Sequence, residues 1–201
     1  TYSKLWNGFT SIDLSNDFTV FNFQSLFVAN NSIVANGQML LIMRCLEQET
    51  IRNYNDLKTN GNSRYIVICV DEAHRFVDSR FPVALQFMAK MVKQIRKYQG
   101  SLIVSTQNVK DFVGQSEESK AAATAVINGC QYSAIFGMMP DDVNSIIELY
   151  KSYSGGLMKS ETEFLSECER GQCLLFVDSN SRITMTVQTF EGEDAYFLNQ
   201  A

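Results

Sequence analysis

Five consecutive apolar residues, Ile66–Val70, end directly in two adjacent carboxylates, Asp71 and Glu72. A short apolar run of this kind is typical of a buried strand. In an open parallel sheet, ligands bind at the carboxyl ends of the strands. The run therefore predicts a buried strand that carries two acids to a ligand-binding edge.

The rest of the chain alternates between strand and helix patterns. Strands are predicted at 11–14, 18–23, 65–70, 101–105, 132–136, 172–177 and 183–187. Helices are predicted at 32–57, 81–98, 117–127 and 140–150, and a short one follows the capping-box pattern of Ser160 and Glu163. This order predicts one α/β domain over residues 1–201, with a largely parallel sheet flanked by helices and an antiparallel hairpin at its edge.

Composition narrows the class of protein. With 201 residues, 45% of them hydrophobic, the chain is long enough to bury one substantial core. Its net charge of -5 gives no indication of a broad basic surface for nucleic acid. The five cysteines have irregular spacing, which predicts reduced, mostly buried thiols in a cytosolic compartment. A single histidine argues against a zinc site. No apolar run approaches the roughly 20 residues of a membrane-spanning helix, so we expect membrane association only through partners.

Asp71 and Glu72 have two interpretations. Adjacent carboxylates repel each other unless a cation lies between them or one is protonated. In nucleotide-hydrolysing motors the first acid serves Mg²⁺ and the second polarises the attacking water. The alternative is a helix N-cap followed by a first-turn glutamate, before the helical pattern that starts at Ala73. The two roles are compatible.

Four further polar residues are candidates for the site. Gln107 follows the next strand, where an amide can bond a terminal phosphate or the attacking water; the alternative is a polar loop residue. Arg96 ends a helix and is a candidate arginine finger or a solvated charge, and Arg170 is a second, weaker candidate. For His74 we expect a surface position or a supporting role beside the site.

Several segments resemble one family in their order and spacing. They are Asp71-Glu72-Ala73, the helix end at 95–100, the strand end at 105–112, the opening at 6–23, and the tail at 170–175. Together they resemble the VirB/TraE-type ATPases of conjugation and type IV secretion, within the FtsK–HerA class of P-loop motors. The resemblance extends over nearly the whole chain.

The resemblance implies a RecA-like core that hydrolyses ATP with Mg²⁺. It implies assembly into homo-hexamers, association with other type IV secretion subunits at the cytoplasmic face of the membrane, and DNA as one candidate substrate. Carried onto this sequence, Asp71 would serve Mg²⁺ through water, Glu72 would activate the attacking water, and Gln107 would sense the γ-phosphate. Arg96 or Arg170 would contact the nucleotide across a subunit boundary.

The sequence departs from the family in one motif. It contains no Gly-x-x-x-x-Gly-Lys-Ser/Thr loop, which in the family lies upstream of the matched segment. We therefore expect a C-terminal portion of the core that neither binds ATP tightly nor hydrolyses it alone.

Two alternatives to a motor remain. One is a non-catalytic docking module of the secretion apparatus. The other is a DEAH-type helicase fragment, since Asp71–His74 spells that tetrapeptide; however, Ser105-Thr106-Gln107 stands where a Ser-Ala-Thr motif is expected, and no Gln-Arg-x-Gly-Arg run follows.

Overall fold

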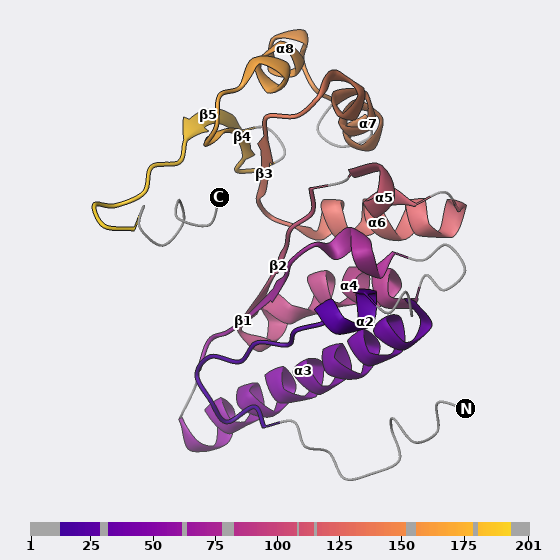
Figure 1. Cartoon of the computed structure of the whole chain (residues 1–201). Coiled ribbons are helices and arrows are strands. Elements are labelled where there is room, and N and C mark those ends of the chain that lie inside the picture. Colours follow the sequence, from indigo (N-terminus) through magenta and orange to yellow (C-terminus); the bar gives the residue numbers. More distant parts are fainter. Residues whose placement is uncertain are drawn as a thin grey trace.

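The computed structural model describes residues 13–28, 32–61, 64–77, 83–107, 109–114, 116–151, 156–178 and 181–193. The helices are α2 (Gln24–Val28), α3 (Ser32–Asn60), α4 (Val83–Gln94), α5 (Val109–Val113), α6 (Glu117–Gly129), α7 (Pro140–Tyr150) and α8 (Lys159–Glu167), with 3₁₀ turns η1 (Ala73–Phe76) and η2 (Ile95–Tyr98). The strands are β1 (Ile66–Val70), β2 (Gly100–Val104), β3 (Ser133–Phe136), β4 (Gln172–Phe176) and β5 (Arg182–Thr186). Figure 1 shows their arrangement.

β1 and β2 form a parallel pair, in register from Ile66 opposite Gly100 to Val70 opposite Val104. Side chains alternate between the two faces of a strand. Ile68 and Val70 point into a core shared with α3, α4 and α6, where Leu85 and Met88 are fully buried. α3 and α4 lie along this side of the pair (Figure 1).

The antiparallel strands form a second sheet in the order β3-β4-β5. Its inner face packs on α7 and α8 through a smaller core that contains Leu165, Leu174 and Phe176. Val109 of α5 and Ile127 of α6 pack against this core, while Phe112 of α5 belongs to the first one. The two cores therefore meet at α5 and α6.

The α/β fold with parallel and antiparallel strands is confirmed. Among the described residues, however, the antiparallel strands form their own three-stranded sheet rather than the edge of the parallel one. The helices and strands predicted from residue 32 onward are close to their observed bounds, although the last turn of the helix ending at Tyr98 tightens to 3₁₀. The short helix α5 was not predicted. The extent of the single domain stays a prediction.

The predicted strand at 18–23 is wrong. These residues are irregular, and Phe18 and Val20 are 85% and 71% exposed because no neighbouring strand covers them. The side chain of Asn22 accepts a hydrogen bond from the Gln24 amide (2.8 Å) and starts α2 instead. Phe23 then packs edge-on against Phe76, with ring centroids 5.2 Å apart. Of the predicted strand at 11–14, residues 13 and 14 are irregular and the others lie outside the described residues, as does the opening from Trp6 to Thr10.

The expectation of mostly buried thiols is wrong for Cys69. Its side chain is on the outer face of β1 and is exposed, because a two-stranded pair is covered here on one side only. Cys173 is buried, and burial raises the pKa of the thiols of Cys130, Cys168 and Cys173. All five cysteines are free thiols.

The described helices include none that is both long enough and apolar enough to cross a membrane.

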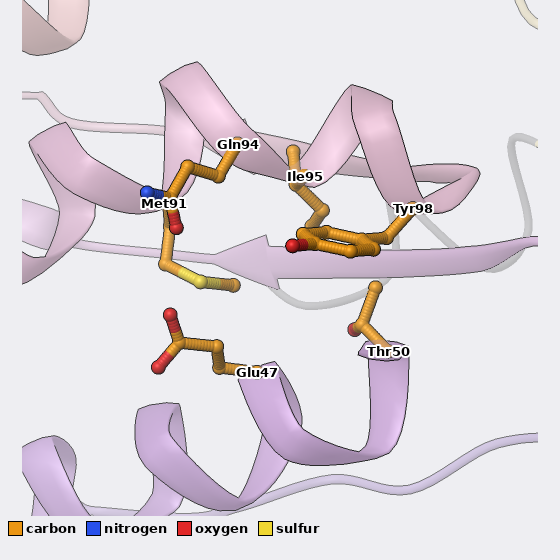
Figure 2. Close-up of a pocket in the computed structure, with 6 residues that line it drawn as sticks. All are labelled: Glu47, Thr50, Met91, Gln94, Ile95 and Tyr98. Carbon is orange, nitrogen blue, oxygen red and sulfur yellow. The ribbon is translucent and has the colours of Figure 1, made fainter. Parts of the chain in front are cut away.

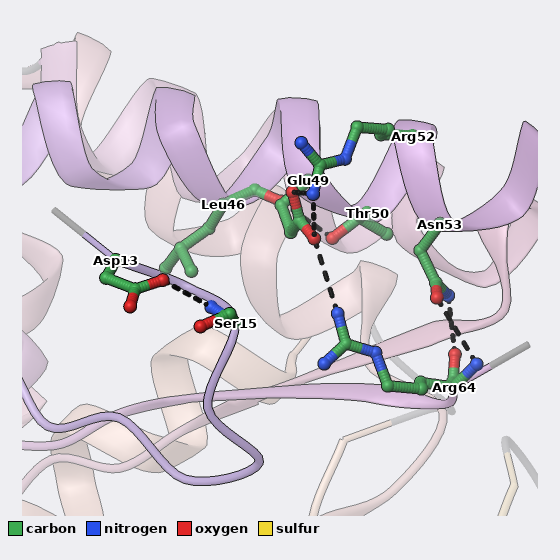
Figure 3. Close-up of polar contacts among 8 residues, drawn as sticks. All are labelled: Asp13, Ser15, Leu46, Glu49, Thr50, Arg52, Asn53 and Arg64. Carbon is green, nitrogen blue, oxygen red and sulfur yellow. Dashed lines mark hydrogen bonds and ion pairs between the residues drawn. The ribbon is translucent and has the colours of Figure 1, made fainter. Parts of the chain in front are cut away.

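A side-chain clamp joins the end of α3 to the entry of β1. Asn53 is 8% exposed; its amide nitrogen donates to the Arg64 carbonyl (2.5 Å), and its oxygen accepts from the Arg64 amide (3.2 Å). Glu49 of α3 forms ion pairs with Arg64 (3.4 Å) and with Arg52 of the same helix (3.2 Å), as Figure 3 shows. The clamp fixes where the chain enters the strand that carries Asp71.

We expect Asn53→Ala to lower the free energy of unfolding by about 1–3 kcal/mol, because it leaves both backbone groups of Arg64 without their partner. Urea unfolding of the 201-residue chain measures the change. Arg52→Ala, on the neighbouring and 75% exposed side chain, is the control and should cost less than about 1 kcal/mol. Equal losses in the two variants would contradict the clamp.

Candidate functional site

The carboxyl ends of β1 and β2 bring the two predicted acids beside the predicted glutamine segment. The ladder continues past both strands, since the Ser105 amide donates to the Val70 carbonyl (2.9 Å) and the Ala73 amide donates to the Ser105 carbonyl (2.9 Å). Asp71 and Glu72 therefore lie next to Ser105–Gln107, at the sheet edge where the sequence placed them.

Asp71 is held on one oxygen only. Its Oδ1 accepts hydrogen bonds from the Ser105 hydroxyl (2.5 Å) and from the Glu72 amide (2.9 Å). Among the described residues none donates to Oδ2, and the side chain is exposed. The carboxylate is thus oriented from the protein side and open on the solvent side, as a metal-serving acid must be.

Glu72 has an unusual backbone. Its φ of 50° and ψ of 44° lie in the left-handed region, which non-glycine residues adopt rarely and at a cost of about 1–3 kcal/mol. This turn leads the chain into η1, and Glu72 Oε2 lies 3.3 Å from His74 Nδ1. Its Oε2 is buried yet has no hydrogen bond from any described residue, although the side chain as a whole is 35% exposed. Backbone strain and unsatisfied buried polar atoms cluster at functional sites, so both features make Glu72 a candidate site residue.

His74 lies between Glu72 and the end of β2. Its Nδ1 is 3.1 Å from the Thr106 hydroxyl oxygen and 3.3 Å from Glu72 Oε2, and its side chain is 13% exposed. The sequence predicted either a surface position or a supporting role for His74, and the geometry favours the supporting role. No sequence signal marked this role, because His74 meets Thr106, 32 positions away, only through the pairing of β1 with β2.

The other candidates are not all at this edge. Gln107 is exposed, one residue beyond Thr106. Arg96 is exposed in η2, which precedes β2, so a five-residue strand of about 13 Å separates it from the acids. Arg170 is exposed in the turn before β4, in the other sheet. A role for either arginine in the site of a neighbouring subunit stays a prediction.

A crevice elsewhere in the first core is not this site. It lies between α3 and the α4–η2 segment (Figure 2) and is lined by Glu47, Thr50, Met91, Gln94, Ile95 and Tyr98. Glu47 is already paired with Lys90 (2.9 Å) and Arg44 (3.0 Å), so its charge is balanced. The crevice holds about 10 Å³, room for no more than one water.

The acids fit Mg²⁺ but do not form a complete metal cage. No cluster of three or more histidine, cysteine or acidic side chains occurs in the described ranges. Mg²⁺ keeps several waters and is bound by one or two carboxylates together with substrate phosphates. Asp71, with its free oxygen, suits that role, and the phosphates would need a cradle that this sequence does not contain.

One comparison with known proteins gives a close structural match. No protein-family model and no curated protein sequence matches the chain. Among solved structures, VirB4 of Thermoanaerobacter pseudethanolicus is 30% identical, with a TM-score of 0.73 over 96% of this chain. The chain spans about half (47%) of that VirB4 chain. The chain is therefore similar to part of VirB4 in both sequence and fold.

Proposed function

We propose that this chain is the C-terminal part of the ATPase core of a type IV secretion motor of the FtsK–HerA class. The observation that carries the proposal is the meeting of Asp71 and Glu72 with the Ser105–Gln107 segment at one sheet edge. The similarity to VirB4 over 96% of the chain supports it.

In this proposal bound ATP supplies the bond to be cleaved, and bound Mg²⁺ supplies positive charge that neutralises the phosphates. Asp71 would hold a Mg²⁺-bound water through the oxygen that Ser105 leaves open. Glu72 accepts a hydrogen bond from the attacking water and aligns it for in-line attack. Gln107 bonds the terminal phosphate or the same water. Arg96 or Arg170 acts across the boundary with a neighbouring subunit.

The proposal includes the assembly as well. The parent protein forms a hexamer, binds other type IV secretion subunits, and lies at the cytoplasmic face of the membrane through those partners. A phosphate-binding loop from a segment outside these 201 residues completes the nucleotide site. DNA is one candidate substrate of the parent.

The test compares this chain with the full-length parent. We expect the parent to release phosphate from ATP in a Mg²⁺-dependent reaction, because its loop cradles the phosphates, and we expect no turnover from the 201-residue chain. Phosphate release measured with and without EDTA decides this. Mg²⁺-dependent turnover by the short chain, abolished by Glu72→Gln, would contradict the missing-cradle part of the proposal. A parent without turnover would contradict the motor and favour the docking module.

A further inference from the structure

His74 is a titratable side chain at this sheet edge that the proposed mechanism does not use. It is the only histidine in the chain, it is mostly buried, and a single ring nitrogen faces oxygen atoms from two different strand ends. A solvated surface histidine has no such arrangement. A metal role is also unsupported, since the described residues contain no cluster of metal-binding side chains.

The chemistry of the two oxygens selects the protonation of the ring. A carboxylate only accepts hydrogen bonds, whereas a hydroxyl both donates and accepts. A bare Nδ1 beside buried Glu72 Oε2 would place a lone pair 3.3 Å from an acceptor that has no other partner. A protonated Nδ1 donates to the Thr106 hydroxyl at 3.1 Å and places its N–H 3.3 Å from Glu72 Oε2, an electrostatic contact without hydrogen-bond geometry. The geometry thus favours the Nδ1–H form.

We propose that His74 is a positioning residue for Glu72, with its Nδ1–H held between Glu72 Oε2 and the Thr106 hydroxyl. The ring fixes one carboxylate oxygen and leaves the remainder of the carboxylate for the attacking water. Through Thr106 it also sets the distance between Glu72 and Gln107, which follows directly in the chain. The inference rests on the proposed function, because it assigns Glu72 its task.

The kinetic test uses two matched variants of the full-length parent. His74→Leu removes the donor, and we expect kcat to fall about tenfold with the KM for ATP unchanged, the usual scale for removing a residue that orients a reactive group. In His74→Asn the side-chain amide nitrogen can occupy the place of Nδ1, and we expect kcat within about threefold of the wild type. Thermal unfolding of both variants controls for folding.

Equal losses of kcat in both variants, or an unchanged kcat in His74→Leu, would overturn the inference. A wild-type parent without ATPase activity, or one that stays active as Glu72→Gln, would instead overturn the proposed function and the catalytic part of this inference with it.

The geometric part has a test that needs no activity. Because the chain has one histidine, ¹⁵N labelling gives one pair of ring-nitrogen signals. In the 201-residue chain, at a pH where the ring is neutral, we expect Nδ1 at the protonated position and Nε2 at the unprotonated one. Glu72→Ala should shift the population toward the Nε2–H form that an unrestrained histidine side chain favours. An Nε2–H form in the wild type would refute the arrangement even if the parent hydrolyses ATP.

Discussion

Glu72→Gln should lower the kcat of ATP hydrolysis by the full-length parent by about 10²–10⁴-fold, the usual range for removing a general base. The amide has the size of the carboxylate and leaves the backbone turn at φ 50° intact. In the proposed mechanism it loses the negative charge that would polarise the attacking water. Binding of ATP should persist, because the proposal assigns the phosphates and Mg²⁺ to other residues.

Phosphate release and equilibrium binding of a fluorescent ATP analogue measure the two halves of this prediction. Glu148→Gln is the matched control, since it makes the same change on a side chain of α7 that is 75% exposed. We expect its kcat to equal the wild-type value. Full activity of Glu72→Gln would remove the acid from the mechanism, and loss of nucleotide binding together with turnover would assign it to binding instead.

Phe176→Ala should lower the free energy of unfolding by about 3–5 kcal/mol, the range for deleting a buried ring. Phe176 is 1% exposed at the centre of the second core, and its ring centroid lies 4.9 Å from that of Tyr150. The Arg182 guanidinium lies over the ring, 4.8 Å from its centroid, and pairs with Glu161 at 2.7 Å. Removing the ring leaves a cavity, and the Arg182–Glu161 ion pair loses the aromatic surface on which it packs.

Urea unfolding of the 201-residue chain measures the loss. Phe18→Ala is the matched control, because that ring is 85% exposed, and it should change the free energy by no more than about 0.5 kcal/mol. Such a loss at Phe176 is a large share of the 5–15 kcal/mol that holds a typical domain folded. A loss of under 1 kcal/mol would show that the second core is not packed as described.

The strand–acid junction was predictable because it is local. An apolar run that ends at Val70 and is followed by two carboxylates specifies a strand and its polar end without knowledge of any neighbour, but not its burial, since Val67 and Cys69 are exposed. Helices α4, α6 and α7 were predictable for the same reason, since each carries its own periodicity. The strand at 18–23 failed because alternation alone does not supply a partner strand, and Asn22 starts a helix there.

The candidate residues of the nucleotide site also divide into those predictable from local sequence and those that depend on contacts between distant parts. Asp71, Glu72 and Gln107 follow from strand ends, and the parallel pairing of β1 with β2 brings their segments together. Arg96 and Arg170 depend on subunit contacts that one chain does not contain, so they stay predictions. His74 carried no pattern in the sequence that set it apart.

The sequence by itself determined most of the strands and helices from residue 32 onward, and that two acids follow an apolar strand, because hydrophobic periodicity and strand ends are local properties. Only the tertiary structure decided that Ser105 orients Asp71, that Glu72 adopts a left-handed backbone, and that His74 lies between Glu72 and Thr106. The Ser105–Asp71 and His74–Thr106 contacts join residues 34 and 32 positions apart, so their geometry depends on the register of two strands.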